Sequence, residues 1–493
     1  MHVVLAVLVL SGPLVLSSCR RPTGGTSGTD GGDTAGGDSG SGGPAPSVLV
    51  RGSGDAMSLA VGPFVNLRTS GATEEGLFWG WGDVSSESQI YFTLAPGGSL
   101  RSSEIPVADQ LATAIPLPGG RGCVGVHYAD FTAWYHPFEG DPVSLGQAHG
   151  LDLSPSGSKL LVYAGDRVSC FDTTTWASTP QPEIPSFEFP YSGANVTWID
   201  DTLVAVRFWE PAGGPLGLDP DTGIIKLVSQ PDGAVVGVLE SENDILAPFP
   251  SPDGMWLAVL HIDGPTAVTP PEGVYPVDVG LQISVYARSA LSSPEPAPAA
   301  VLRPGEGKLM TGLVWSPDSR MLAYAEASVF PAHPDEFPLA AGARQVSVAR
   351  APGFEAETRS PGDGDFTPLS FSPASSTLAL ADRETNTVCL WDLASFGGIR
   401  APETVATYDL AWLSENLLCG RLETGDGPGR PVLIRASTTA EVIDLGWPGS
   451  WRWVTGGMLV AMTTHVEAGG SLELFGEVPE GDWLVVYPAL VSQ

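Results

Sequence analysis

Histidines, cysteines and carboxylates are the residues of this chain that could support catalysis or metal binding, and their spacing matches no common catalytic pattern. The chain has no Gly-x-Ser-x-Gly segment, so it lacks the nucleophile elbow of one large class of hydrolases. It has no His-Glu-x-x-His or Cys-x-x-Cys segment to hold zinc, and no glycine-rich loop with Lys-Ser or Lys-Thr to hold phosphate. The sequence therefore predicts no catalytic residue, no metal site and no cofactor, and we expect a protein that is not an enzyme.

Two pairs of polar residues come closest to a local site. His127 and His136 flank a short loop in a strand pattern. A metal-binding pair is conceivable there, but structural or surface histidines with satisfied hydrogen bonds are the favoured interpretation. Asp200 and Asp201 are adjacent in the chain, and adjacent side chains of a strand point in opposite directions. This pair is therefore interpreted as part of a turn.

The charge of the chain excludes one class of partner. The formal net charge is −33, and the only lysines are Lys159, Lys226 and Lys308. Because affinity for phosphate backbones comes from lysine and arginine, we expect no nucleic-acid partner and no binding to anionic lipid through the protein surface. The acidity favours solubility first and attraction of cations or basic partners second.

The first 46 residues read as a leader followed by a linker. Residues 3–18 form one apolar run, too short for a membrane span and typical of a secretory signal, although only His2 stands where a basic residue is usual. Leu16-Ser17-Ser18-Cys19 resembles the bacterial lipobox, which implies lipidation of Cys19 after removal of residues 1–18; Arg20 then implies the outer membrane. Residues 19–46 are mostly Gly, Ser, Thr and Asp and predict a disordered tether.

Residues 47–493 carry a repeat and predict one domain. Segments beginning at Gly150, Leu246, Gly312 and Pro368 each hold an apolar strand, a Ser-Pro-x-x turn and a second, more apolar strand. Proline presets the first corner of such a turn, and Asp, Ser or Gly tolerate the second. Weaker copies fill the gaps and give a period of about 40–50 residues, which is typical of propeller blades.

The segments 312–325 and 368–393 resemble TolB-like and WD-repeat propellers, through their Ser-Pro-x-x turns and the Leu390-Trp391-Asp392 strand ending. The resemblance implies an all-β fold, a single propeller of four-stranded blades. Nine units can be counted between residues 57 and 490. Such rings often close by pairing strands from both termini, and 48–51 could supply one, which would merge the two ends. The expected number of blades is therefore eight, with seven or nine as alternatives.

Three consecutive units have a long connection between their second and third strands, at 209–216, 263–280 and 327–343. The resemblance places these connections on one face of the ring. Two explanations of these long connections remain open: neutral insertion, which surface loops tolerate at little cost in free energy, and a role in binding. As a binding rim they would offer aromatic and acidic side chains, namely Trp209, Glu210, Asp263, Tyr275, Asp278, Phe330, His333, Asp335, Glu336 and Phe337.

Tryptophans and cysteines complete the inventory. Most tryptophans recur at equivalent strand positions and predict core between blades, with carbohydrate stacking as an alternative for Trp209 or for Trp79 and Trp81. Besides Cys19, cysteines lie at 123 and 170 in one pair of neighbouring units and at 389 and 419 in another. Each pair could form a disulfide in an exported protein, but buried thiols are favoured.

These observations favour an exported, lipid-anchored and monomeric scaffold of the cell envelope. It would bind an unknown envelope protein or ligand and would contact the membrane through its anchor alone, on the periplasmic side or at the cell surface. The alternative is a propeller enzyme, a glycan hydrolase or lyase with its site at the central channel. A purely structural envelope component is a third interpretation.

Overall fold

A computed structural model describes residues 46–488 of the chain, with gaps. The residues outside the description in that span are 52–57, 73–77, 86–87, 96–97, 107–110, 165–166, 181–194, 209–222, 231, 242–244, 262–281, 306–307, 331–338, 341–343, 360, 362–363, 396, 402–404, 423–429, 437–439, 445–449, 456–458 and 473–474. The predicted signal peptide, Cys19 and almost all of the tether precede the described residues.

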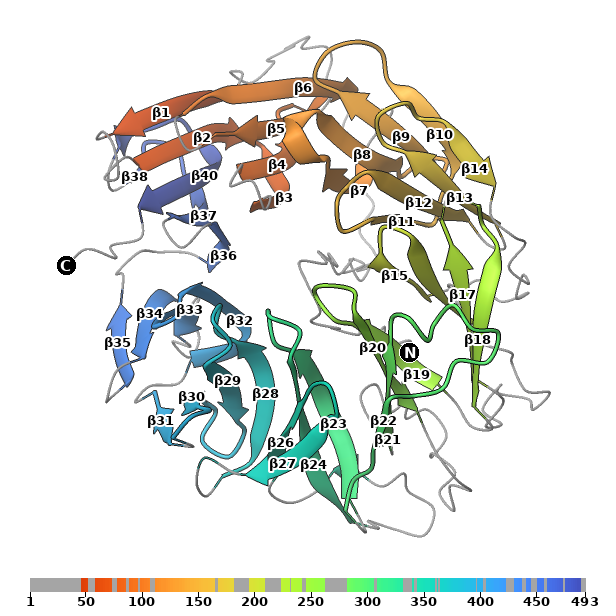
Figure 1. Cartoon of the computed structure of the whole chain (residues 1–493). Helices are drawn as coiled ribbons and strands as arrows, with labels where there is room; N and C mark the ends of the chain where they lie inside the picture. The colour runs from red at the N-terminus through yellow and green to blue at the C-terminus, as the bar shows by residue number, and fades with distance from the viewer. Residues whose placement is uncertain are drawn as a thin grey trace, which may run out of the picture.

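The described strands form nine sheets of four or five antiparallel strands, and one further sheet of two short strands. Figure 1 shows the large sheets arranged around a centre, each with its first strand innermost. We call them blades 1 to 9 in chain order. In the part of the chain that the structure describes, no helix has the length and hydropathy needed to cross a membrane.

Blades 1 to 4 follow one another without crossovers. Blade 1 contains β3 (Asn66–Ala72), β4 (Phe78–Asp83), β5 (Ser88–Leu94) and β6 (Leu100–Pro106). Blade 2 contains β7 (Leu111–Pro116), β8 (Gly122–His127), β9 (Thr132–Pro137) and β10 (Val143–Gln147), with a 3-10 turn at Pro118–Gly120. Blade 3 contains β11 (Gly150–Leu153), β12 (Lys159–Ala164), β13 (Arg167–Asp172) and β14 (Ser178–Pro180). Blade 4 contains β15 (Asn195–Asp200), β16 (Leu203–Phe208), β17 (Gly223–Ser229) and β18 (Val235–Ser241).

Blades 5 to 8 repeat this order, and blade 6 carries one extra short strand. Blade 5 contains β19 (Ile245–Pro250), β20 (Trp256–His261), β21 (Gln282–Ala287) and β22 (Ala300–Leu302). Blade 6 contains β23 (Lys308–Trp315), β24 (Met321–Phe330), β25 (Leu339–Ala340), β26 (Gln345–Arg350) and β27 (Glu355–Arg359). Blade 7 contains β28 (Phe366–Phe371), β29 (Thr377–Asp382), β30 (Thr387–Asp392) and β31 (Gly398–Arg400). Blade 8 contains β32 (Val405–Ser414), β33 (Leu417–Leu422), β34 (Arg430–Ala436) and β35 (Ala440–Asp444).

Blade 9 joins the two ends of the described chain. From the centre outwards its strands are β36 (Ser450–Thr455), β37 (Leu459–Val466), β40 (Gly481–Pro488), β2 (Ser58–Phe64) and β1 (Ser47–Arg51). The small sheet of β38 (Ser471–Leu472) and β39 (Gly476–Glu477) lies between β37 and β40 in the chain. Residues Leu59 and Val486 are register partners across the β2–β40 junction. The expected closure by an N-terminal strand is therefore present, and it uses two strands.

The expected number of eight blades is corrected by this arrangement. Nine units were counted in the sequence, and the closing strands were expected to merge the first unit with the last. Instead β1 and β2 are added to the outside of the last unit, and the first unit keeps four strands of its own. The nine sheets of the described chain correspond to the alternative of nine blades.

The buried side chains show that neighbouring blades pack against one another all the way round. Among the described residues they form nine apolar clusters, one at each junction between successive blades. The cluster of blades 9 and 1 contains Phe64, Phe78 and Phe92, with the rings of Phe64 and Phe92 stacked at 5.3 Å. Each sheet is thus covered on both faces, which a ring of blades achieves without an open stack end.

Tryptophans on innermost strands add a repeated polar contact at these junctions. Trp198 Nε1 donates to the carbonyl of Asp152 at 3.2 Å, and Trp315 Nε1 donates to the carbonyl of Phe249 at 3.0 Å. Trp412 Nε1 donates to Ser370 Oγ at 3.2 Å. In every case the acceptor lies on the innermost strand of the preceding blade. The prediction that these tryptophans form core between blades is confirmed for these three residues.

The Ser-Pro-x-x segments form the expected turns between first and second strands. In blade 6, Ser316 Oγ accepts the N–H of Met321 at 2.8 Å, and its carbonyl accepts the N–H of Ser319 at 2.8 Å. The fourth turn residue has a left-handed φ, +69° at Gly254 and +59° at Ser319. Glycine, or serine with its short side chain, suits that position.

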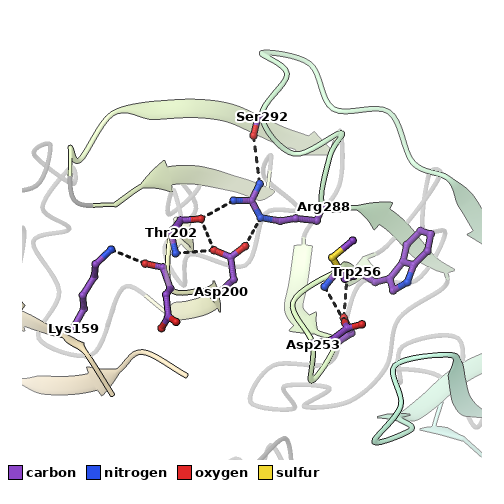
Figure 2. A network of polar contacts seen from close by, with 10 residues as sticks. Lys159, Asp200, Thr202, Asp253, Trp256, Arg288 and Ser292 are labelled. Carbon is purple, nitrogen blue, oxygen red and sulfur yellow. Dashed lines mark hydrogen bonds and ion pairs between the residues drawn. The ribbon is translucent and has the colours of Figure 1, made fainter. Parts of the chain in front are cut away.

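The turns of adjacent blades are joined to one another. The N–H of the third turn residue donates to an acceptor in the next blade: Ser156 to Asp201 Oδ1 at 3.0 Å, Asp253 to Ser319 Oγ at 3.0 Å, and Ala374 to Glu415 Oε2 at 2.6 Å. Figure 2 shows one stretch of this network, where Lys159 Nζ donates to the carbonyl of Asp201 at 2.6 Å and Arg288 pairs with Asp200. The prediction that Asp200 and Asp201 belong to a turn is confirmed, and each also binds a neighbouring blade.

Replacing Glu415 by alanine is expected to lower the free energy of unfolding by about 1–2 kcal/mol, because three donors of blade 7 lose a charged acceptor. These donors are Ser372 Oγ at 2.5 Å, the Ala374 N–H and the Ser376 hydroxyl. Although partial burial opposes it, the hydrogen bonds from Ser372 and Ser376 lower the pKa of Glu415 below its usual 4.5. The stabilisation is therefore present above pH 4.5 and is lost as the pH falls through the lowered pKa.

Urea denaturation at pH 7 and pH 3.5 measures this effect. The exposed Glu384 of blade 7 supplies the matched control. Glu384→Ala should change the free energy of unfolding by less than about 0.5 kcal/mol, as is usual for surface substitutions. A Glu415→Ala variant as stable as the control at pH 7 would refute the role of this carboxylate.

Candidate interaction face

The two faces of the ring differ in what they carry. Because strands alternate in direction, one face holds the turns after first strands and after third strands, and we call it the turn face. The other holds the connections between second and third strands and the crossings from blade to blade, and we call it the connection face. The three long connections that the sequence singles out all leave from the connection face, after β16, β20 and β24.

The predicted rim falls almost entirely outside the described residues. These positions are Trp209, Glu210, Asp263, Tyr275, Asp278, His333, Asp335, Glu336 and Phe337. The backbone of Phe330 is described: it ends β24 and pairs with Leu339 of β25. The third long connection thus starts as a two-stranded extension of blade 6, and the rim itself remains a prediction.

A second aromatic group, which the sequence reading did not single out, lies on the described part of the connection face. Residues 128–131 connect β8 to β9 in blade 2, and we call them the aromatic turn. Tyr128 is 63% exposed and Phe131 is 49% exposed, and their ring centroids are 6.4 Å apart. Phe131 also meets the ring of His149 edge-on at 6.0 Å.

The aromatic turn is held by its own backbone. The Phe131 N–H donates to the carbonyl of His127 at 3.0 Å, and its carbonyl accepts the N–H of Ala148 at 2.6 Å. Asp130 Oδ1 accepts the N–H of Thr132 at 3.0 Å, and hydrogen bonds from Thr132 lower the pKa of Asp130. Phe131 has a φ of +54°, a conformation that bulky residues rarely adopt and that occurs often at functional sites. Two aromatic rings are therefore presented to solvent on a fixed turn.

Two buried histidines lie beneath the aromatic turn. His127 Nε2 and His136 Nε2 are 3.1 Å apart, and each residue is 5% exposed. The indole of Trp134 stacks on the His127 ring at 5.4 Å and 8°. Burial, together with the smaller effect of the neighbouring His127, lowers the pKa of His136 from 6.5 to about 4. The favoured interpretation of structural histidines agrees with this contact, in which one neutral ring donates to the other.

The geometry gives little support to the alternative of a metal site at this pair. Within the described residues, no group of three or more His, Cys, Asp or Glu side chains is arranged to hold a metal ion. The side of blade 2 that carries the two histidines faces blade 1, where Trp79, Trp81 and Tyr91 pack with Cys123. This junction is rich in aromatic side chains. Among its buried atoms, Trp81 Nε1, Tyr91 Oη and Trp134 Nε1 have no hydrogen-bond partner in the described structure.

Three other polar residues of the connection face join neighbouring blades. Gln89 Oε1 accepts the N–H of Leu111, the first residue of blade 2, at 3.3 Å. Asp482 Oδ2 of blade 9 accepts the N–H of Leu67 in blade 1 at 2.9 Å. Asp365 accepts both the N–H of Arg344 at 3.0 Å and its guanidinium at 2.7 Å. These carboxylates and amides are explained by backbone donors at the crossings between blades.

Two further features of the structure involve residue types that are common in catalysis, namely a serine–histidine contact and a buried carboxyl group. Neither is arranged as a catalytic site. Ser284 Oγ lies 2.8 Å from His261 Nε2, yet Ser284 is only 3% exposed and the same nitrogen lies 3.1 Å from Gln282 Nε2. Burial raises the pKa of Asp152 to about 7, against hydrogen bonds from the backbone of Trp198 and Leu153. Asp152 belongs to the junction of blades 3 and 4, where its carbonyl also accepts the Trp198 indole.

The four cysteines of the described residues are buried free thiols, as favoured from the sequence. Cys123 packs toward blade 1 and Cys170 packs toward blade 4, so the sheets of blades 2 and 3 separate them. Cys389 packs toward blade 6 and Cys419 toward blade 9, on the outer sides of blades 7 and 8. The alternative of disulfides between adjacent blades is corrected for this reason. Burial raises the pKa of Cys170 and of Cys389 to about 11.

Alkylation by iodoacetamide should therefore leave these four cysteines unmodified in the folded protein at pH 8, because a buried neutral thiol is a poor nucleophile. After denaturation without reductant, peptide mass spectrometry should find an adduct at each of Cys123, Cys170, Cys389 and Cys419. A peptide pair that becomes alkylated only after reduction would reveal a disulfide and contradict the buried-thiol assignment.

Comparison with known proteins shows the fold and leaves the function open. No family model matches this chain, and no curated protein matches its sequence. A crystal structure of the eukaryotic initiation factor matches with a TM-score of 0.51 and 12% identity, over 81% of this chain and 96% of that one. Hsv2 of Kluyvelomyces marxianus matches with a TM-score of 0.36 and 11% identity, over 68% and 96%. The Mitotic Checkpoint Complex matches with a TM-score of 0.34 and 12% identity, over 80% and 94%. The first of these, together with the described sheets, supports an all-β, WD-repeat-like propeller.

Proposed function

We propose that this propeller is a protein-binding scaffold that docks its partner on the connection face. The observation that carries the proposal is the aromatic turn, in which Tyr128 and Phe131 are 63% and 49% exposed on a backbone fixed by hydrogen bonds. Tyrosine and other aromatic residues are enriched among the residues that dominate binding energy at interfaces. The three long connections of blades 4, 5 and 6 leave from the same face and would extend the surface.

The charge of the chain suggests the chemistry of the partner. With a net charge of −33, the chain would repel acidic partners. Asp130 is ionised at neutral pH and lies between Tyr128 and Phe131 in the chain. A partner with a basic surface around an apolar or aromatic anchor fits this combination, because charge complementarity steers encounter while the aromatic contact supplies affinity.

Site-specific photocrosslinking in the producing cells tests the proposal. A benzophenone amino acid at position 128 should give one discrete protein adduct, identified by mass spectrometry. The control places the same group at Met255, which is 55% exposed in a turn of the opposite face. Phe131→Ser should reduce the position 128 adduct at least about 10-fold, as loss of a dominant interface contact does. Failure to crosslink at 128, or the same adducts at 128 and 255, would count against a docking site on this face.

The proposal places the scaffold at the cell envelope, held by lipid on Cys19. The support is the sequence alone: the apolar run 3–18, Ser17-Ser18-Cys19 and the tether to residue 46. The resemblance also suggests the TolB-like variety of propeller and a monomer. Metabolic labelling with a fatty acid should mark the wild-type chain and leave Cys19→Ala unlabelled and in the soluble fraction. Equal labelling of both chains would remove the anchor from the proposal.

The proposal also treats the ring as a non-enzyme. The support is that Gln89, Asp365 and Asp482 of the described connection face accept backbone N–H groups at blade crossings. The alternative of a glycan hydrolase or lyase requires carboxylates free to meet substrate in the channel. Incubation of the purified chain with envelope polysaccharides, followed by mass spectrometry of the products, distinguishes the two; cleavage abolished by Asp152→Asn would favour the enzyme.

A further inference from the structure

An aromatic ring and a carboxylate share one arginine at three places in the described structure. The groups are Arg68 with Trp81 and Asp83, Arg101 with Phe138 and Glu139, and Arg400 with Phe366 and Asp382. The guanidinium lies over the ring, 5.9, 4.9 and 5.4 Å from its centroid, and pairs with the carboxylate at 2.9, 3.5 and 2.8 Å. The planar guanidinium suits both partners, because it stacks on aromatic faces and forms hydrogen-bonded ion pairs with carboxylates.

In two of these groups the ring and the carboxylate come from neighbouring positions of one short segment. Phe138 is adjacent to Glu139, and Trp81 is two positions from Asp83. Side chains this close in the chain therefore suffice to hold an arginine that comes from another strand.

The aromatic turn carries the same two kinds of group without an arginine of its own chain. Asp130 is two positions from Tyr128 and adjacent to Phe131. Its carboxylate is exposed, and the hydrogen bonds described for it come from Thr132 and from its own backbone. Among the described residues, no arginine or lysine pairs with Asp130 or lies over the Tyr128 or Phe131 ring.

The aromatic turn is also open to a group from outside. Tyr128 and Phe131 are 63% and 49% exposed, whereas Trp81 and Phe366, which hold arginines of the chain itself, are 4% and 1% exposed. A ring attracts a cation within about 6 Å of its centroid, so two rings 6.4 Å apart can act on the same guanidinium. Because hydrogen bonds already fix the backbone of the turn, little ordering is left to the binding step.

We propose that the aromatic turn binds an arginine side chain of the partner protein, whose guanidinium lies on the rings of Tyr128 and Phe131 and pairs with Asp130. This inference rests on the proposed function, and it names the chemical group that the same site recognises. The net charge of −33 favours the approach of a cation. Lysine suits the site less well, because its ammonium group is a compact and strongly hydrated charge.

Fluorine NMR of the full chain, with fluorotyrosine at position 128, tests the inference without the partner. The probe is the peptide acetyl-Gly-Arg-Gly-amide, titrated at a constant ionic strength of about 0.15 M so that screening does not change. The control peptide carries citrulline, which has the shape of arginine but no charge. The arginine peptide should shift the signal saturably, with a midpoint about 10-fold lower than that of the citrulline peptide. A lysine peptide should have a midpoint between the two.

Two variants separate the contributions of the carboxylate and the ring. Asp130→Asn keeps an acceptor for the Thr132 N–H and loses the charge, so the arginine midpoint should rise about 2- to 5-fold. Asp141→Asn makes the same change of charge at an exposed position of the turn face of blade 2, and should leave the midpoint unchanged. Phe131→Leu removes one aromatic face and should also raise the midpoint about 2- to 5-fold.

Equal midpoints for the arginine and citrulline peptides would overturn the inference, and so would the absence of a saturable shift or an unchanged midpoint in Asp130→Asn. A lower midpoint for the lysine peptide would reject arginine as the group recognised. The crosslinking at position 128 keeps these failures apart from failure of the proposed function. An adduct that forms equally with and without Asp130→Asn would retain the docking site and reject the arginine, whereas loss of the adduct in the otherwise unaltered chain would reject the docking site itself.

Discussion

A chain that lacks residues 47–64 is expected to lose its cooperative unfolding transition. This deletion removes β1 and β2, and with them the side chains of Leu59, Ala60, Val61 and Phe64, each at most 1% exposed. Burial of the Leu59, Val61 and Phe64 side chains stabilises the fold by about 1.5–3 kcal/mol each. The expected loss of unfolding free energy is therefore on the order of 5–10 kcal/mol. Because a whole domain is stable by about 5–15 kcal/mol, the truncated ring should be open or unfolded at 25 °C.

Thermal melting followed by circular dichroism measures this change. The matched control deletes residues 20–37, a stretch of the same length that the sequence predicts to be part of a tether. That chain should melt as the full chain does, because it keeps every strand of blade 9. A truncation of 47–64 that retains the full melting temperature would show that β2 does not close the ring.

The second large effect concerns the side chain that β2 covers. Trp483 of β40 is 1% exposed, its Nε1 donates to the carbonyl of Pro479 at 3.1 Å, and a Cβ atom on Gly62 would come within 2.6 Å of its ring. Trp483→Ala is therefore expected to lower the free energy of unfolding by about 3–5 kcal/mol, the usual cost of emptying a buried aromatic site.

Trp483→Phe separates the contributions of volume and hydrogen bond. It keeps most of the ring and loses the indole donor, so a smaller loss of about 1–2 kcal/mol is expected. Equilibrium urea unfolding gives both values, provided that the slope with denaturant stays the same. A loss below 1 kcal/mol for Trp483→Ala would mean that β40 and β2 are not packed together in the folded protein.

The repeat could be read from the sequence because local chemistry sets it. The Ser-Pro turns at 154, 251, 316 and 372 need only a hydroxyl, a proline and a small fourth residue, all of which are visible in the chain. The spacing of the turns then gave nine units. The error of one blade arose at the ends, because pairing of β2 with β40 joins residues more than 400 positions apart and no local pattern says whether it adds strands or merges units.

The contacts at the junctions could be predicted only in part. Tryptophan at a repeated strand position indicated core, and Trp198, Trp315 and Trp412 lie there. The cysteines were assigned to neighbouring units, but which face of a strand each thiol occupies depends on register, and one residue of shift reverses it. Cys123 and Cys170 consequently face opposite neighbours.

The site was the least predictable part. His127 and His136 were noted as flanking a loop, but their meeting depends on the register of β8 and β9, which places Cys123 opposite His136. Tyr128 and Phe131 lie in that same loop, and two aromatic residues within a four-residue strand connection were the available signal. They were missed because apolar residues in a strand-rich segment are read as core, whereas here Tyr128 and Phe131 are 63% and 49% exposed.

Closure of the ring by the N-terminal strands is the claim on which the faces, the blades and the proposed docking site depend, and a cysteine pair tests it most directly. Ala60 and Val485 are register partners across β2 and β40, which is the spacing a disulfide needs. An Ala60→Cys, Val485→Cys chain secreted under oxidising conditions should contain that bridge, identified by mass spectrometry of unreduced peptides. The control pair Ala60→Cys, Val460→Cys places the second cysteine on β37, one strand further in, and should stay reduced. Absence of the 60–485 bridge, or equal bridging in the control, would contradict the closed ring.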